Sequence, residues 1–281
     1  MMHPWRVSTY ALMLAAAGLP LYIHLPRYAT GELGLSLATL GVILAGIRVM
    51  DFAQDPALGW LVDRYPARKP AFAVLAALGM GLGFVMLYTL RPETGTIPWL
   101  IAALVLVFTA YSLGTILFYG QSAALAGSPD GLIRLAGYRE AGTLGGIILA
   151  ATAPTALVAL GASGSGYSAF GLLLAAVCLI ALVVSRPLWR VSAPAERPLS
   201  LSELRSSGAL GLLGLAFVNA LPVAITSTLF LFFVEDRLRL PDLAGPFLIL
   251  FFLAAGLSVP LWTRASARFG PARVLVPAMG L

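Results

Sequence analysis

Residues 35–62 read LSLATLGVILAGIRVMDFAQDPALGWLV, an apolar run that contains three charged residues. A bilayer core about 30 Å thick needs about 20 residues of helix, so this run is long enough to cross a membrane. A charged side chain at that depth is costly, and it normally faces a cavity or a partner rather than lipid. The stretch therefore predicts a membrane-spanning helix with one polar face.

The chain as a whole is also strongly apolar. Of its 281 residues, 59% are hydrophobic and 11% are charged, whereas a soluble domain has roughly 45–50% and about 25%. These values exclude an ordinary soluble domain, a disordered chain and a small secreted module held by disulfides. Cys178 is the only cysteine, so no internal disulfide can form. The net charge of +6 does not indicate a nucleic-acid partner, because the cytoplasmic loops of membrane proteins collect Lys and Arg.

Apolar runs of spanning length recur along the chain, and we predict an all-α integral membrane protein with eight spans. The predicted spans are residues 7–26, 35–62, 71–90, 98–125, 141–160, 167–185, 209–234 and 243–263. The first run is longer than the apolar core of a signal peptide, so we interpret it as an uncleaved span. Residues 274–281 are apolar but too short to cross, and they predict the start of a ninth span.

The basic residues predict the orientation of these spans. If the N-terminus is cytoplasmic and the spans alternate, the cytoplasmic segments hold 13 of the 18 Lys and Arg residues and the outer segments hold four. This asymmetry favours a cytoplasmic N-terminus. We predict a six-helix bundle over residues 1–186, a cytoplasmic linker over 187–207 and a partial second bundle over 208–281. Ser200 and Glu203 form a capping-box pattern, so a short helix is expected to begin in the linker.

The charges of the second span share one helix face. Arg48, Asp51 and Asp55 stand at offsets of zero, three and seven residues. One arginine neutralises one acid, and the surplus carboxylate suits Na⁺ or a bound proton. Pro56 frees a backbone carbonyl near Phe52 that could also face an ion. The alternative is an ion pair that only fixes the helix against its neighbours, although such a pair does not require the second aspartate.

The cytoplasmic end of the same span carries a second group of polar residues. It consists of Gly59, Asp63, Arg64, Arg68 and Lys69. Glycine permits close helix approach, and the charges can pair with neighbouring helix ends, as a cytoplasmic gate requires. The alternative is a simple basic anchor on the cytoplasmic side.

A family resemblance lies in the second span and the loop after it. It is carried by Gly34-Leu35-Ser36, Gly41, Arg48, Asp51, Asp55-Pro56, Gly59-Trp60 and Val62. This string resembles the second-helix signature of the glycoside–pentoside–hexuronide:cation symporters, the family of the melibiose carrier within the major facilitator superfamily. Residues 59–69 are similar to the superfamily's motif between helices two and three.

The resemblance implies two six-helix bundles that alternate in access around a central site. It implies that Asp51, Asp55 and Thr115 bind the coupling cation, Na⁺ or H⁺, with no other cofactor. It also implies that Arg139 lies near the solute, although a basic anchor is the alternative for that residue. Family members have about twelve spans, so the chain is interpreted as C-terminally truncated. We expect a monomer in the plasma (inner) membrane whose partners are lipid, the cation and a solute.

The sequence departs from the sugar carriers of this family at two places. Ala15 and Phe118 stand where those carriers place sugar-binding aspartates in helices one and four. Aromatic and amide groups could bind a sugar or similar small organic solute instead. The predicted solute-site residues are Arg48, Tyr22, Tyr111, Tyr119, Gln121, Arg139 and Asn219. His24, near the outer end of span one, is interpreted as an interfacial residue rather than a proton carrier.

Two other classes of protein fit part of the pattern. An intramembrane prenyltransferase would use the Asp51-x-x-x-Asp55 spacing to bind Mg²⁺–diphosphate, but it needs a second acidic motif that the other half of the chain lacks. A receptor built on a transporter scaffold is not excluded by any residue. Because no nucleophile–base arrangement, phosphate-binding loop or Cys/His metal cluster is recognised, we do not expect an enzyme.

Overall fold

The structure is a computed structural model that describes residues 5–90, 94–191, 208–240, 243–270 and 273–275. Every element in the described ranges is a helix, which confirms the all-α fold class. The chain divides into two compact units, Met1–Pro194 with Gly256–Leu281, and Ala195–Ala255. The predicted linker helix at Ser200 lies outside the described residues, and so does most of the predicted ninth span.

The first six predicted spans are confirmed as helices long and apolar enough to cross a membrane, on length and composition. They are α1 (Trp5–Leu19) continued by η1 (Pro20–His24) and α2 (Leu25–Gly31); α3 (Leu37–Arg64); η2 (Pro66–Arg68) with α4 (Lys69–Phe84) and η3 (Val85–Thr89); α5 (Thr96–Ala126); α6 (Pro129–Ala159); and α7 (Tyr167–Ser185) with η4 (Arg186–Arg190). Predicted spans seven and eight are occupied by α9 (Ala209–Phe232) with η5 (Phe233–Arg237) and by α10 (Ala244–Phe269).

Local sequence signals explain where the helices begin and end. The Ser36 hydroxyl accepts a hydrogen bond from the Thr39 backbone N–H at 3.0 Å and caps the start of α3. At the α5–α6 junction, Gly127 ends α5 with a φ of +66°, a conformation that suits glycine. Ser128 then caps α6 by accepting a hydrogen bond from the Gly131 N–H at 3.1 Å. These turns keep the connections short, so neighbouring helices in the sequence run in opposite directions.

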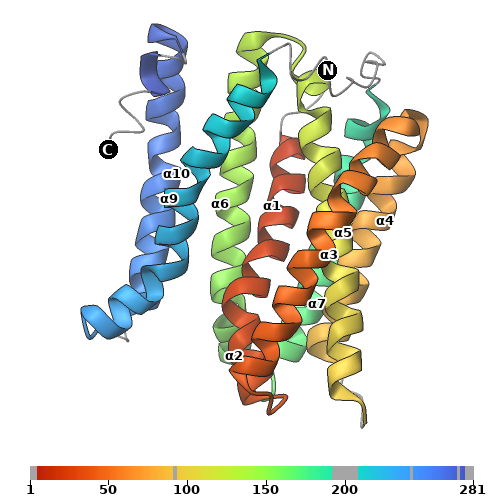
Figure 1. Cartoon of the computed structure of the whole chain (residues 1–281), viewed down its shortest axis with the longest axis vertical. Helices are drawn as coiled ribbons and strands as arrows, with labels where there is room; N and C mark the ends of the chain where they lie inside the picture. The colour runs from red at the N-terminus through yellow and green to blue at the C-terminus, as the bar shows by residue number, and fades with distance from the viewer. Residues whose placement is uncertain (1–4, 91–93, 192–207, 241–242, 271–272, 276–281) are drawn as a thin grey trace. The chain divides into compact units, whose positions relative to one another are not determined.

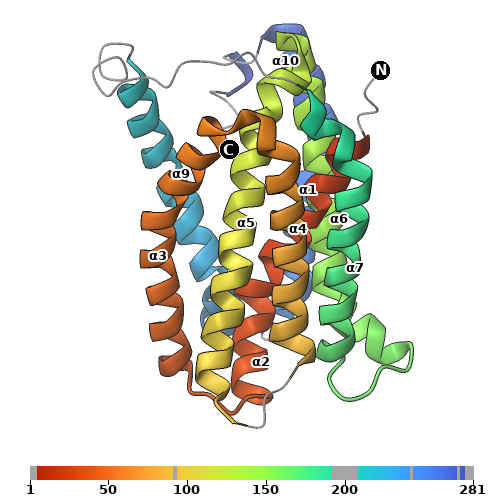
Figure 2. The same cartoon turned by 90° about the vertical axis from the view of Figure 1, so that its right-hand side faces the viewer.

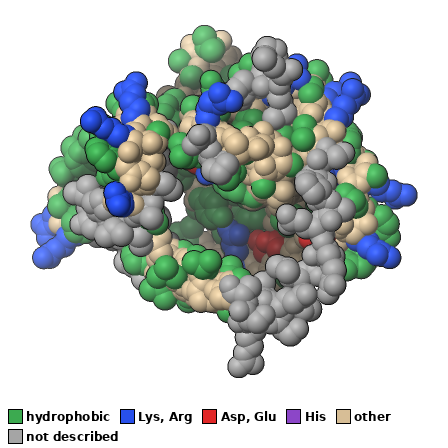
Figure 3. Space-filling model, turned by 90° about the horizontal axis from the view of Figure 1, so that it is seen from above, with side chains coloured by type: hydrophobic (Ala, Val, Ile, Leu, Met, Phe, Trp, Pro, Cys, Tyr) green, Lys and Arg blue, Asp and Glu red, His purple; other side chains and the backbone are tan. Residues whose placement is uncertain are grey.

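The N-terminus, the α3–α4 connection and the α5–α6 connection lie at the same end of the first unit (Figure 1). Seen from that end, Lys and Arg side chains project outward around the face (Figure 3). This arrangement agrees with a basic cytoplasmic side. The orientation of the N-terminus itself stays a prediction.

Helices α1 and α6 approach each other closely. A Cβ atom on Gly142 or Gly146 would overlap the backbone carbonyls of Ser8 and Leu12 respectively, so only glycine permits this approach. At one end of the contact the Ser8 hydroxyl donates to the Tyr138 carbonyl at 2.7 Å. The two helices are therefore joined by backbone packing rather than by large side chains.

Helix α4 contacts α5 on one side and α7 on another (Figure 2). Gly83 of α4 lies directly against Val107 of α5. In contrast, α3 packs mainly on α5, and only 11% of its apolar window is buried, against 50% for α5. The exposed surface of α3 includes large apolar side chains such as Val49 and Phe52, whereas Asp51 on its polar face is buried.

The segment η1 interrupts the first helix with π-helical geometry. It is fixed from two sides, because the Tyr88 hydroxyl donates to the Pro20 carbonyl at 3.1 Å and His24 Nε2 lies 2.9 Å from the Ala150 carbonyl. The His24 ring also packs edge-on against Tyr167. His24 therefore connects η1 to α6 and α7, which agrees with a structural role better than with proton transfer.

Candidate cation and solute site

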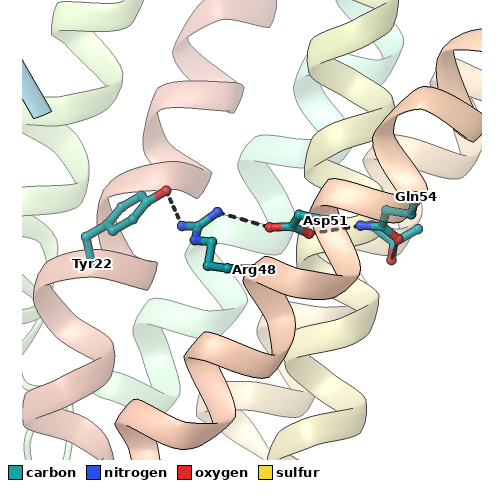
Figure 4. Close-up of polar contacts among 5 residues, drawn as sticks. Tyr22, Arg48, Asp51 and Gln54 are labelled. Carbon is teal, nitrogen blue, oxygen red and sulfur yellow. Dashed lines mark hydrogen bonds and ion pairs between the residues drawn. The ribbon is translucent and has the colours of Figure 1, made fainter. Parts of the chain in front are cut away.

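A continuous set of polar contacts crosses from η1 through α3 to α5, and we call its five members, Tyr22, Arg48, Asp51, Gln54 and Thr109, the polar chain. Figure 4 shows four of them in a row. Arg48 Nη1 donates to Asp51 Oδ2 at 3.0 Å, and Gln54 Nε2 donates to Asp51 Oδ1 at 3.0 Å. The Thr109 hydroxyl of α5 donates to Gln54 Oε1 at 2.9 Å. The predicted Arg48–Asp51 pair is thus formed within a larger network.

The Arg48 side chain is held by groups on two other elements. Its Nη2 donates to the Tyr22 hydroxyl at 2.5 Å. Its guanidinium lies 5.4 Å from the centre of the Tyr22 ring and 5.0 Å from that of Phe108, within the range of cation–π attraction. The Arg48 side chain is 50% exposed, whereas that of Asp51 is 12% exposed. The arginine is therefore the accessible member of the pair.

The two aspartates of α3 have different surroundings. Both oxygens of Asp51 accept hydrogen bonds, one from a guanidinium and one from an amide, so an ionised carboxylate is well satisfied there. Asp55 lies one turn further along, close enough to interact electrostatically with Asp51. Its Oδ1 atom is buried and has no hydrogen-bond donor among the residues that the structure describes. A buried carboxylate oxygen without a donor is costly unless a proton or a cation compensates it.

The Thr115 hydroxyl is also buried and makes no hydrogen bond of good geometry, although it interacts with the Tyr111 hydroxyl one turn earlier. Helices α3 and α5 run in the same direction (Figure 2), and the Gln54–Thr109 contact fixes their register. Thr115 then lies roughly 7–8 Å further along the bundle than Asp55, at about 1.5 Å of rise per residue. The backbone of Thr115 is therefore offset along the bundle from that of the two aspartates.

Two predicted solute-site residues are in contact with each other. The Arg139 guanidinium of α6 lies 5.0 Å from the centre of the Tyr119 ring of α5. Arg139 Nε also pairs with Glu140 Oε1 at 3.1 Å. Tyr119 is 54% exposed and Tyr22 is 60% exposed, so both rings are accessible. The Tyr111 ring, in contrast, packs against Gly18, where a Cβ atom would lie 3.2 Å from its hydroxyl.

The structure corrects the expected surroundings of Gln121. This side chain is fully buried, and its Oε1 accepts a hydrogen bond from Lys69 Nζ at 2.8 Å. Its Nε2 donates to the carbonyls of Val191 at 2.5 Å and Leu188 at 3.3 Å. All of its amide functions are used to join α4, α5 and η4, so Gln121 does not face a solute cavity here.

The other predicted gate residues are exposed or lack close neighbours from other helices. Asp63, Arg64 and Arg68 are exposed, and no described residue of another helix lies within 4 Å of where a Cβ on Gly59 would stand. Asn219 is exposed on α9, in the second unit. Its role stays a prediction.

Two members of the polar chain were not expected from the sequence. Gln54 stands three residues after Asp51, so helical spacing alone could have placed it on the same face. Thr109 offers no such signal, because its partner belongs to another helix.

The long apolar helices, with charged side chains on the face of one of them, define a multi-pass membrane protein. A family model described as MFS/sugar transport protein matches residues 7–281. The chain therefore belongs to this family of the major facilitator superfamily, and membership points to a transporter rather than an enzyme. A search of curated proteins gave no match.

Proposed function

We propose that the protein is a cation-coupled secondary transporter of a sugar or a similar small organic solute. The observation that carries this proposal is the buried Asp55 Oδ1 atom, which has no donor and lies one turn from a carboxylate that is already satisfied. Asp51 and Arg48 together are close to neutral, so the surplus negative charge belongs to Asp55. A small monovalent cation or a proton at Asp55 would remove the cost of that charge.

The proposed division of roles follows from these contacts. Asp55 receives the coupling ion, Asp51 remains ionised beside it, and Thr115 of α5 is the proposed third ligand. The solute would lie against accessible aromatic rings, of which Tyr22 and Tyr119 are examples, with Arg139 as a hydrogen-bond donor. Aromatic faces with a few polar groups are typical of sites for small organic ligands.

Cation binding can be tested on the purified protein by thermal unfolding in Na⁺ against choline at constant ionic strength, and by a pH series. A ligand present at a hundred times its Kd stabilises by about 2.7 kcal/mol. We expect Na⁺ or acid to raise the unfolding temperature of the wild type. Asp55→Asn should abolish that increase, and Thr115→Val should reduce it less.

Asp63→Asn is the matched control, because it makes the same chemical change about two turns further along α3 at an exposed side chain. It should keep the full response to the ion. A response that survives in Asp55→Asn would show that the ion does not bind there. Coupling itself is tested by uptake of labelled sugars into vesicles under an imposed Na⁺ or H⁺ gradient, which should drive uptake in the wild type and not in Asp55→Asn.

A further inference from the structure

We infer that Tyr22 is a positioning residue that holds Arg48 against Asp51 as a built-in counter-ion, and that this counter-ion weakens binding of the coupling cation. The inference rests on the proposed function, since it concerns the same pair of carboxylates. Tyr22 would thus change the affinity for the ion through Arg48, without touching the ion itself.

The guanidinium of Arg48 is held at both of its terminal nitrogens. One terminal nitrogen of Arg48 bonds Asp51 while the other bonds the Tyr22 hydroxyl. Two contacts at opposite nitrogens fix the orientation of a planar group, which a single ion pair would not do. The Tyr22 and Phe108 rings add attraction on the guanidinium itself. Tyr22 therefore sets both the position and the direction of the positive charge.

The backbone around Tyr22 is itself held in position. Tyr22 lies in the middle of η1, whose ends are fixed by the Tyr88–Pro20 and His24–Ala150 contacts. A hydroxyl on such a segment can hold Arg48, whose own side chain is long and 50% exposed. Without that hydroxyl, solvent would compete for the guanidinium and the ion pair would be weaker.

The position of Arg48 sets the net negative charge that a cation meets at the two aspartates. Asp51 and Asp55 interact electrostatically, so the potential at Asp55 depends on how fully Arg48 neutralises Asp51. When Arg48 is held in place, the incoming cation meets about one net negative charge. When Arg48 is released, it meets closer to two. Loss of the Tyr22 hydroxyl should therefore tighten cation binding, whereas ordinary structural damage to the site would weaken it.

The experiment is equilibrium binding of ²²Na⁺ to the purified full chain, with proton uptake measured in parallel. Tyr22→Phe removes the hydroxyl but keeps the ring under Arg48. We expect the half-saturating concentration of the bound ion to fall by about three- to tenfold, because Arg48 keeps its bond to Asp51 and only part of the free energy of one hydrogen bond to a charged group is transferred to the ion. An unchanged or higher half-saturating concentration would overturn the inference.

Tyr65→Phe is the matched control. Tyr65 is also an exposed tyrosine whose ring lies beneath an arginine, with Arg68 5.5 Å from the ring centre. It is outside the polar chain, so its loss of a hydroxyl should leave ion affinity unchanged. An equal gain in affinity in Tyr65→Phe would also contradict a specific role of Tyr22.

A second measurement needs no variant of Tyr22. Phenylglyoxal modifies accessible arginines, and mass spectrometry can follow its reaction at Arg48 in the wild type. Bound cation should speed this reaction severalfold, because the cation competes with Arg48 for the carboxylates. A rate that does not respond to the cation would refute the counter-ion role. If Asp55→Asn binds the ion as well as the wild type does, the proposed function has failed; if Asp55→Asn loses binding but Tyr22→Phe changes nothing, only this inference has failed.

Discussion

The buried amide of Gln121 should contribute strongly to the stability of the first unit. It makes one hydrogen bond to the Lys69 ammonium and two to the carbonyls of η4 and the residue after it. A hydrogen bond to a charged group is worth about 1.5–3 kcal/mol and a neutral one about 0.5–1.5 kcal/mol. Because the Leu188 contact is long, we expect Gln121→Ala to cost roughly 3–4 kcal/mol.

The loss of stability can be measured through the reactivity of the Cys178 thiol. Cys178 is the only cysteine and is 2% exposed, so a thiol-reactive dye that fluoresces on reaction reports unfolding directly. For a chain of this size, 1 kcal/mol shifts the unfolding temperature by about 2–4 °C. Gln121→Ala should therefore lower the apparent unfolding temperature by roughly 6–16 °C.

Two variants make the measurement specific to this network. Ser122→Ala is the control, because the neighbouring hydroxyl bonds only a carbonyl of its own helix, Phe118, at 3.0 Å, and its loss should shift the temperature by no more than about 2 °C. Lys69→Met combined with Gln121→Ala should cost less than the sum of the two single changes, since the two residues share a bond. A Gln121→Ala protein as stable as Ser122→Ala would refute the reasoning.

Two further variants test the helix contacts by the same unfolding assay. Gly146→Ala should lower the unfolding temperature by more than about 5 °C, because the added methyl overlaps a backbone carbonyl of α1. Gly145→Ala is the control, since a methyl there meets a side chain at an ordinary 3.4 Å. Equal losses in the two variants would show that α1 and α6 do not approach as closely as described. Thr109→Val should cost about 1 kcal/mol of stability, or about 2–4 °C in unfolding temperature, because Gln54 loses its donor. Thr152→Val is the control and should cost less, because the exposed Thr152 hydroxyl donates only to the Ile148 carbonyl of its own helix. A larger loss in Thr152→Val than in Thr109→Val would contradict the interhelical contact.

Much of the fold could be predicted from the sequence, because each part rests on a local property. A helix in lipid must satisfy its own backbone, so the length and apolarity of a run are enough to predict a span. The first six spans are confirmed on that basis. The Arg48–Asp51 pair was also predictable, since residues three apart on one helix must be neighbours.

What the sequence could not supply is the partner of a side chain across a helix interface. Periodicity describes one helix at a time, and it gives neither the register nor the rotation of the next one. For that reason Gln121 was expected at a solute site, whereas packing against η4 buries it.

The same reason applies to the candidate site. The sequence by itself determined that α3 carries two carboxylates and one arginine on one face. Only the tertiary structure decided that Tyr22 holds the arginine and Thr109 holds Gln54, while Asp55 keeps an oxygen without a donor among the described residues. That difference arises because Tyr22 of η1 reaches Arg48 and Thr109 of α5 reaches Gln54, and it cannot be derived from spacing along a single helix.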